Sequence, residues 1–294
     1  MISNPVPWPN NARCAVAFSF DMDGESNLLR NFGPRAHTMI AARSLGRFEA
    51  QAGVPRILSM LARRGLRQTF FVPGWCVEAY PHAIEQILKG GHEIGHHGYL
   101  HEDPNSMEED EEREAFWRGH ETLVKATGSA PRGYRAPSYA FSHRTLPHLI
   151  EAGMAYDSSL FGDEVPYLLA NAGAGDVLEL PSVLALDDWT QYGDFEMFRS
   201  GAPIASPQKA MEVFRAEFEA AWTCGGHWIP VWHPFLSGRL SRCMAIDGLI
   251  GEMQERGGVW FSTLGEIAAH LRALMQSGTW SPHVEQLPFD QSAL

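Results

Sequence analysis

Short runs rich in β-branched and aromatic residues recur along the chain between longer segments with helical periodicity. This alternation predicts parallel strands joined by crossover helices, because parallel neighbours need a long connection that returns the chain to the same end of the sheet. The 294 residues fit a single α/β domain spanning 1–294, arranged as a barrel. The predicted strands cover residues 15–21, 68–72, 93–97, 133–136, 155–158, 177–180, 229–233 and 259–262.

Proline, glycine and capping residues mark the ends of the predicted helices. Pro55 and Gly65 bracket a helix over 56–64, because proline suits the first helical turn and glycine the residue after the last. Ser106 and Glu109 have the spacing of a capping box, which opens a helix with an acidic, solvated first turn. Further helices are predicted over 81–90, 206–223, 242–256 and 263–275.

Two segments, 25–53 and 184–203, fit neither strand nor helix periodicity, and we predict binding loops or subunit contacts there. The first carries large apolar side chains without one clean helical stripe. We expect it to wall the pocket and to bury these side chains against a second copy of the chain, which implies a homo-oligomer. The side chains in question are Leu28, Leu29, Phe32, Met39, Ile40, Leu45 and Phe48.

Charge and hydropathy exclude two classes of partner. The chain carries 23 basic and 35 acidic side chains, a net charge of −12 with neutral histidines, and its basic residues form no patch, so we expect no nucleic acid. No apolar run reaches the roughly 18 residues of a membrane span, and the first residues lack the pattern of a secretory signal. We therefore expect a cytoplasmic protein that needs no membrane. The four cysteines form no CxxC pair and are expected to be reduced.

Two carboxylates end the first predicted strand, in the sequence FDMDG. Positions i and i+2 of a strand face the same side, so Asp21 and Asp23 are expected to point into one site. Two crowded carboxylates are costly to keep ionised without a cation, which indicates a metal ion nearby. The alternative is a strand that ends in an ordinary turn before Gly24.

The stretch GHEIGHHGYLH contains four histidines in ten residues, around and after the predicted strand 93–97. His97 and His101 have a spacing that lets two imidazoles close on one metal ion across a short turn. They would stand at the same rim as the aspartates, where α/β barrels assemble catalytic groups. We expect His92 and His96 to pack in the interior or to support the ligands. An inert histidine-rich loop is the alternative.

Two more predicted strands end in side chains that are candidates for the active site. Arg135 ends the strand in GYRAPSY, and an arginine beside a carboxylate fixes its orientation. His233 ends the strand in IPVWHP, and a histidine there is a natural proton donor near neutral pH. The plain alternatives are a surface ion pair for Arg135 and a core histidine for His233.

The order of FDxDG, GHEIGHHGYLH, RAPSY and VWHP over residues 15–270 resembles that of the polysaccharide deacetylase family. The resemblance implies a distorted (β/α)7-type barrel that binds one divalent metal ion, zinc or alternatively cobalt, nickel or manganese, and hydrolyses an N-acyl bond. It also implies the following roles: Asp23, His97 and His101 as metal ligands, Asp21 as general base, Arg135 as its positioning partner and His233 as general acid.

One departure from the common extracellular members concerns the aspartates, which are adjacent there and separated by Met22 here. This spacing, with SLGRFEAQAGVPRIL, YDSSLFGDEVPY, LDDW and HPFLSGRLSR, resembles a cytoplasmic branch that contains intracellular peptidoglycan deacetylase-like proteins, an allantoinase type and cyclic imide hydrolases. The resemblance implies a homotetramer. It leaves the metal occupancy and the substrate open.

Three functions fit these residues. The first is a hydrolase of a non-peptide amide bond in a saccharide or a small molecule. The second is ring opening of a small cyclic amide or imide, favoured by bulky rim residues, Trp189, Tyr192 and Phe195, that would narrow the pocket. The third is a non-catalytic binding protein on the same fold. In either enzyme we expect Pro137, Tyr139 and Trp189 to contact the substrate.

Overall fold

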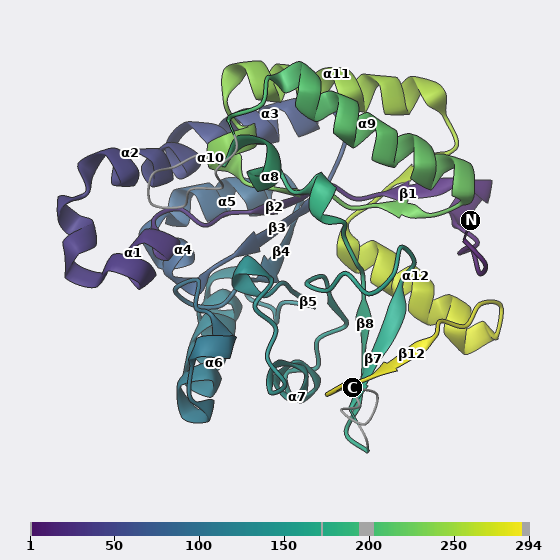
Figure 1. Ribbon diagram of the computed structural model, residues 1–294, viewed down its shortest axis with the longest axis horizontal. Coiled ribbons are helices and arrows are strands. Elements are labelled where there is room, and N and C mark those ends of the chain that lie inside the picture. The colour runs from purple at the N-terminus through teal and green to yellow at the C-terminus, as the bar shows by residue number, and fades with distance from the viewer. Residues whose placement is uncertain (1, 172, 194–202, 290–294) are drawn as a thin grey trace.

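The computed structural model describes residues 2–171, 173–193 and 203–289. Its largest element is a nine-stranded sheet with the order β10-β2-β3-β4-β5-β6-β8-β7-β12 (Figure 1). These strands are β10 Val231–Trp232, β2 Ser19–Asp21, β3 Thr69–Val72, β4 Glu93–His96, β5 Gly133–Tyr134, β6 Tyr156–Asp157, β8 Gly175–Glu179, β7 Tyr167–Asn171 and β12 Val284–Gln286. A three-stranded sheet has the order β11-β1-β9, formed by β11 Val259–Phe261, β1 Cys14–Val16 and β9 His227–Trp228.

All the predicted strand regions contain strands, and the pairs from β10 through β8 are parallel as expected. One predicted strand is split into two pieces, because the run 15–21 becomes β1 and β2, which belong to different sheets. The run 229–233 contains β10 alone, and β9 ends just before it. Not predicted were β7, which forms an antiparallel hairpin with β8, the short β9, and β12.

The predicted closed barrel is not confirmed. Strand pairing among the described residues leaves β10 and β12 as open edges of the nine-stranded sheet. The reason lies in the hairpin, because β7 and β12 extend the sheet beyond β8 instead of letting β8 pair with β10. Only an isolated parallel bridge between Asp187 and Val231 continues the pairing beside β10 within the described part of the chain.

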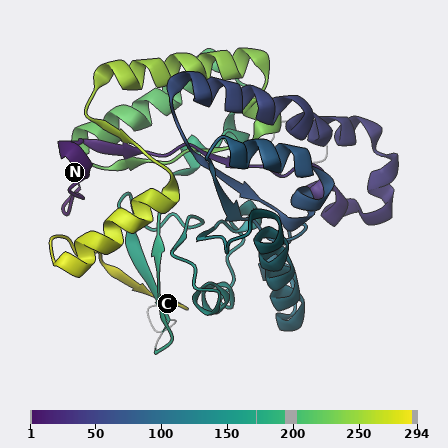
Figure 2. The same cartoon turned by 180° about the vertical axis from the view of Figure 1, so that it is seen from behind.

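Helices cover the sheets on both sides. Figures 1 and 2 show α3 Val54–Arg64, α9 Pro207–Cys224 and α11 Leu240–Arg256 side by side on one side, with α12 Leu264–Ser277 on the other. The aromatic core lies under this first group, where Phe20 stacks on Phe70 at 4.9 Å between ring centroids. The remaining α-helices are α4 Gly74–Ala79, α5 Pro81–Lys89, α6 Glu109–Thr127, α7 Thr145–Glu151, α8 Trp189–Tyr192 and α10 Pro234–Ser237.

The segment 25–53 is helical, which corrects the prediction of an irregular loop. It forms α1 Ser26–Phe32, the 3₁₀ segment Gly33–Thr38, α2 Ile40–Phe48 and the π-helical turn η3 Glu49–Gly53, which runs directly into α3. Two of its glycines, Gly46 and Gly53, lower helix propensity and obscure the pattern, and they lie where the chain contacts other backbone closely. Leu28 is buried within this chain, so it is not available for the predicted subunit contact.

The capping box of α6 uses different residues from those predicted. Glu108 is the N-cap, and its backbone N–H donates to the Glu111 carboxylate at 3.2 Å. Ser106 instead ends a short 3₁₀ turn, where its hydroxyl donates to the Asp103 carbonyl at 2.9 Å. The predicted helix itself is present.

None of the helices in the described ranges combines the length and the apolar character that crossing a bilayer requires. All four cysteines have free thiols, as predicted.

Candidate active site and metal centre

Side chains at the carboxyl ends of neighbouring strands meet at one edge of the nine-stranded sheet. Asp21 is the last residue of β2, His97 follows β4, and Arg135 follows β5. His233 follows β10, which pairs with β2 on the side away from β3. Because these strands are parallel, their carboxyl ends lie together, which is where α/β sheets place binding sites.

A pocket of about 420 Å³ opens at this edge, a volume within the range of small-molecule sites. Helix α1 supplies one wall, and the turns after β2, β4, β5 and β10 supply most of the rest. The pocket is lined by Asp21, Asp23, Asn27, Asn31, His97, His101, Ala136, Ser138, Tyr139, Asp187, Trp189 and His233. The structure thus brings the predicted ligands and proton-transfer groups into one cavity.

The candidate metal ligands Asp23, His97 and His101 are buried, and their ligand atoms lie within 4.8 Å of one another. The Nε2 atoms of His97 and His101 are each 3.4 Å from a carboxylate oxygen of Asp23. A tetrahedral site with metal–ligand bonds of about 2.1 Å has edges of about 3.4 Å, so the donor spacing fits one ion. The Nδ1–H of His97 donates to the Arg135 carbonyl at 2.7 Å, which leaves the Nε2 lone pair directed at the site.

Asp23 has a buried oxygen, Oδ1, without a hydrogen-bond partner among the described residues. Burial by itself raises the pKa of Asp23, but the imidazoles of His101, His97 and His233 outweigh it and hold this pKa well below its usual value. A buried carboxylate oxygen with no donor is expensive, and a cation would satisfy it. The residues present therefore fit a divalent metal ion with nitrogen and oxygen ligands.

Asp21 is held by a buried arginine. Arg135 is fully buried, and its Nη1 donates to Asp21 Oδ1 and to Ser19 Oγ, both at 2.8 Å. Its Nε and Nη2 donate to the carbonyl and hydroxyl oxygens of Ser158. With Oδ1 fixed in this way, the second oxygen of Asp21 lies 3.9 Å from His97 Nε2, at the wall of the pocket.

His233 is oriented by Asp188, a residue to which the sequence reasoning gave no role. The Nδ1–H of His233 donates to Asp188 Oδ1 at 2.8 Å, and Asp188 also accepts the hydroxyl of Ser237. Burial alone lowers the pKa of His233, but the bonded Asp188 carboxylate overrides it and raises this pKa well above its usual value. The other ring nitrogen faces the pocket, 3.8 Å from Asp23 Oδ2. The signal in the sequence was the LDDW stretch, which the resemblance included without assigning its aspartates.

Asp187 is another buried carboxylate that lines the pocket. The hydroxyl of Tyr139 donates to Asp187 Oδ2 at 2.6 Å, and the backbone N–H of Trp189 donates to Oδ1 at 2.8 Å. Burial raises the pKa of Asp187 to about 6, with His233 opposing the rise. Asp187, Asp188 and His233 also have the spacing of a metal-binding group. Hydrogen bonds already satisfy these atoms, from Tyr139 and the Trp189 N–H to Asp187 and from His233 and Ser237 to Asp188. The site around Asp23 is therefore the better metal centre.

Two of the three predicted substrate contacts line the pocket, and one does not. Tyr139 and Trp189 line the pocket, and the Trp189 ring meets that of His233 edge to face at 5.6 Å between centroids. Pro137 lies outside the lining and borders a separate small cavity. Tyr192 is buried under Arg242 and does not reach the pocket, while Phe195 lies outside the described residues. The sequence did not indicate a role for Asn27 and Asn31. These residues reach the pocket wall because they lie on α1, a helix that was not predicted.

His92 and His96 lie away from the pocket. His96 is fully buried, accepts the backbone N–H of Gly98 at Nδ1 and donates from Nε2 to the Phe116 carbonyl at 2.9 Å. His92 accepts the backbone N–H of Gln68 at Nδ1. Burial lowers the pKa of His92 to about 4 and that of His96 to about 3, so both rings are neutral.

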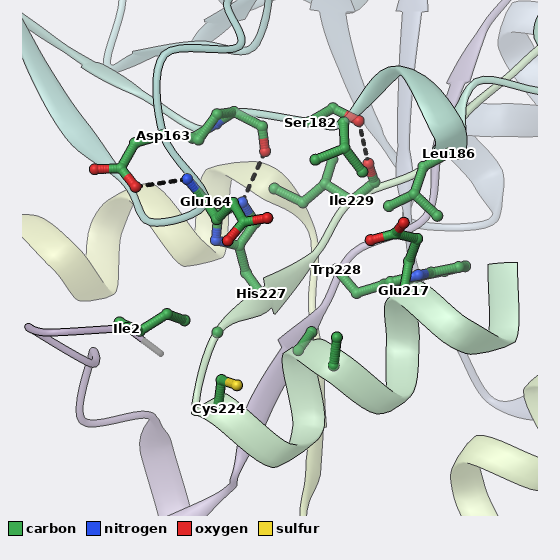
Figure 3. A pocket seen from close by; sticks show the side chains of 15 residues that line it. Ile2, Asp163, Glu164, Ser182, Leu186, Glu217, Cys224, His227, Trp228 and Ile229 are labelled. Atoms are coloured by element: carbon green, nitrogen blue, oxygen red, sulfur yellow. Dashed lines mark hydrogen bonds between the residues drawn. The ribbon is translucent and has the colours of Figure 1, made fainter. Parts of the chain in front are cut away.

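A second pocket, of about 120 Å³, lies beside α9 and β9 (Figure 3). Its histidine, His227, donates from Nε2 to the Pro181 carbonyl at 2.7 Å. Acidic side chains of Asp163, Glu164 and Glu217 border it, but none forms a metal-spaced cluster with His227 in the part of the chain described. The pocket at the strand ends is therefore the candidate site.

Comparison with known proteins identifies the family of this chain. Residues 46–156 match the family model for polysaccharide deacetylase. A candidate polysaccharide deacetylase from Mycobacterium smegmatis is 40% identical and superposes with a TM-score of 0.90, covering 98% of this chain and 99% of that one. The Puue allantoinase is 27% identical with a TM-score of 0.79, covering 92% and 95%. A peptidoglycan deacetylase of Helicobacter pylori is 27% identical over 280 residues, 86% of this chain and 94% of that protein. The chain therefore belongs to the polysaccharide deacetylase family.

Proposed function

We propose that this protein hydrolyses an amide bond of a saccharide or small molecule with one divalent metal ion, zinc, held by Asp23, His97 and His101. Membership of the family makes the chain a hydrolase of carbon–nitrogen bonds other than peptide bonds. The observation that carries the metal assignment is the buried carboxylate of Asp23. Its Oδ1 has no hydrogen-bond partner among the described residues and lies 3.4 Å from His97 Nε2, and its Oδ2 lies 3.4 Å from His101 Nε2. Cobalt, nickel and manganese remain alternatives with the same ligands.

Zinc in such a site supplies Lewis-acid activation of the amide carbonyl and of water. Asp21 accepts the proton of the attacking water at the oxygen that Arg135 does not hold. Arg135 fixes the rotamer of Asp21, because its buried guanidinium donates to Oδ1 of this carboxylate. The pair thus presents one defined acceptor to the pocket.

His233 donates a proton to the departing nitrogen from Nε2. Asp188 holds the opposite ring nitrogen, so the tautomer and the direction of the ring are both fixed. The raised pKa of His233 favours the protonated ring, the form that a general acid requires. Base and acid therefore stand at different strand ends, after β2 and after β10, with the candidate ligands between them.

Two substrate classes fit this arrangement. An N-acyl saccharide is supported by the similarity to the peptidoglycan deacetylase of Helicobacter pylori. Ring opening of a small cyclic amide or imide is supported by the similarity to an allantoinase and by the pocket, which α1 walls on one side and Tyr139 and Trp189 on another. Assays of zinc-loaded protein on acetylated chitooligomers and on succinimide and allantoin separate the two. Turnover of the chitooligomers alone would exclude ring opening.

Replacing Asp21 with Asn tests the mechanism and excludes a non-catalytic binding protein. We expect kcat to fall by about 10²–10⁴-fold, because the amide cannot accept the proton, while one equivalent of zinc is retained. Asp176→Asn, at an exposed ion pair with Arg272, is the matched control and should keep wild-type turnover. Turnover of Asp21→Asn within threefold of wild type would contradict the role of Asp21.

We also propose a homotetramer and a cytoplasmic location. The proposal of assembly is supported by large exposed apolar side chains on α2 and α11, namely Ile40, Leu240 and Met244, which are 69%, 66% and 73% exposed. Sedimentation as a monomer at micromolar concentration would contradict assembly. Cell fractionation checks the location.

A further inference from the structure

The helical segment 46–53 lies between two turns of the active site. Gly46 is so close to the Asp23 turn that a Cβ built on it would stand 2.4 Å from the Gly24 carbonyl oxygen. A Cβ on Gly53 would stand 2.4 Å from the Pro234 carbonyl oxygen, in the turn that carries His233. Side chains are thus excluded at both ends of the segment, and its backbone touches both turns. In Figure 1 the chain from β2 through α1 and α2 returns to the sheet at this place, beside α10.

Glu49 sits at the middle of this segment and reaches both turns with one carboxylate. Its Oε2 accepts the backbone N–H of Gly24, directly after Asp23. Its Oε1 accepts the backbone N–H of Phe235, two residues after His233, at 3.3 Å. The two N–H groups belong to strand ends that are more than two hundred residues apart in sequence. One side chain therefore connects the turn of a candidate ligand with the turn of the candidate acid.

Glu49 places a carboxyl group where burial makes one costly. The carboxylate is fully buried, and in the described ranges no Lys or Arg forms an ion pair with it. Burying a carboxylate without a cation is costly, and burial accordingly raises its pKa well above the usual value, with Asp23 adding to the rise. An apolar side chain would fill the same space at lower cost, but it would leave the N–H groups of Gly24 and Phe235 unsatisfied. What the carboxylate adds is the two-point connection.

We propose that Glu49 is a positioning residue that fixes the turn of Asp23 relative to the turn of His233. The separation it sets is the 3.8 Å between Asp23 Oδ2 and His233 Nε2 across the pocket. An error of about 1 Å in such a separation can cost about 10²-fold in rate. The effect on turnover rests on the proposed function, whereas the connection between the turns does not. The segment belongs to the stretch SLGRFEAQAGVPRIL, to which sequence reasoning gave no chemical role.

The experiment compares Glu49→Gln with Glu112→Gln. Glutamine has the shape of glutamate but only one acceptor oxygen, so one of the two N–H donors must face an amide NH2 group. Glu112 is also a buried carboxylate with several hydrogen bonds, but it contacts Ser142 and Thr145 outside the pocket. Hydrogen exchange measured by mass spectrometry, zinc affinity by competition with a chelator, and kcat and KM are the readouts.

In Glu49→Gln we expect amide exchange in both turns, 22–26 and 233–237, to accelerate at least tenfold, with exchange elsewhere within twofold of wild type. Zinc affinity should fall at least tenfold, and kcat should fall 10- to 100-fold with KM within threefold. Glu112→Gln should change none of these at the two turns. If Glu49→Gln does not fold, Glu49→Asp, which keeps the charge but is shorter, should accelerate exchange at both turns.

Three results would overturn the proposal: acceleration at only one turn, acceleration spread over the protein as in a global destabilisation, or unchanged zinc affinity and kcat despite two loosened turns. If wild-type protein turns over none of the amides, the proposed function fails separately. In that case exchange and zinc affinity still decide the role of Glu49.

Discussion

The two pairs of histidines within GHEIGHHGYLH lie a few residues apart and have opposite environments. His97 and His101 border the pocket with Nε2 directed at Asp23. His92 and His96 are turned into the protein interior, and both accept a backbone N–H at Nδ1. The residue type and the spacing of four residues are the same in both pairs, so neither decides which rings can bind a metal ion.

Hydrogen-bond partners make the difference. His97 donates from Nδ1 to a carbonyl, which leaves a lone pair on Nε2, whereas His96 uses both ring nitrogens on backbone groups and has none left. A neutral imidazole has one donor and one acceptor, so its acceptor nitrogen can serve either a metal ion or a backbone N–H. The pocket pair can therefore hold an ion, and the core pair stabilises the fold.

Removing one member of the pocket pair tests this difference most strongly. The affinity for zinc should fall by orders of magnitude in His97→Ala or His101→Ala, because the two remaining protein ligands cannot hold the ion. Elemental analysis and chelator competition measure the loss. His92→Asn should bind zinc as wild type does. The metal centre would be refuted if the purified wild type held no divalent metal and did not respond to added zinc or cobalt.

Removing His96 should affect stability and not the metal. His96→Ala deletes a fully buried ring that stacks on Phe116 at 4.7 Å between centroids and leaves two backbone groups without partners. We expect the free energy of unfolding to fall by about 3 kcal/mol, the usual cost of a large buried side chain and its hydrogen bonds. Denaturant unfolding measures it, and zinc-saturated protein should still hold one equivalent. If His96→Ala lost zinc but kept its stability, His96 would belong to the metal site and not to the core.

The sequence predicted the features of the fold and the site that depend on short-range patterns. Strand periodicity located every strand from β1 to β6, and the aspartate and histidine spacings placed Asp21, Asp23, His97 and His101 in one pocket. The β7–β8 hairpin, which keeps the sheet open, was missed because its strands pair with each other and not in the parallel order of the rest. Such pairing depends on tertiary contacts that no short window contains.

Residues that act through distant partners were the hardest to find. Asp188 and Glu49 look like ordinary acidic residues in the sequence, and their importance appears only when His233, Gly24 and Phe235 are seen against them. Their partners are between 25 and 186 residues away along the chain. Motif reasoning assigns residues at strand ends well, because the topology brings strand ends together, and it assigns their supports poorly.

The smallest expected effect, taken per pH unit, is the pH dependence of stability contributed by His92. Its pKa is lowered from 6.5 to about 4 in the folded protein, because burial disfavours the charged ring and Nδ1 must stay unprotonated to accept the Gln68 N–H. The unfolded chain therefore binds one more proton than the folded one between pH 6.5 and about 4. Stability from this residue is present above pH 6.5 and is lost as the pH falls, by at most about 1.4 kcal/mol per pH unit.

His92→Asn keeps an acceptor for the Gln68 N–H but cannot titrate. The difference in unfolding free energy between wild type and this variant should therefore shrink steadily as the pH falls from 7 to 4.5, and the contributions of all other groups cancel in the difference. Urea unfolding at intervals of half a pH unit measures it. A difference that stays constant over this range would mean that His92 is protonated in the folded protein, and the core pair would then not be two neutral rings.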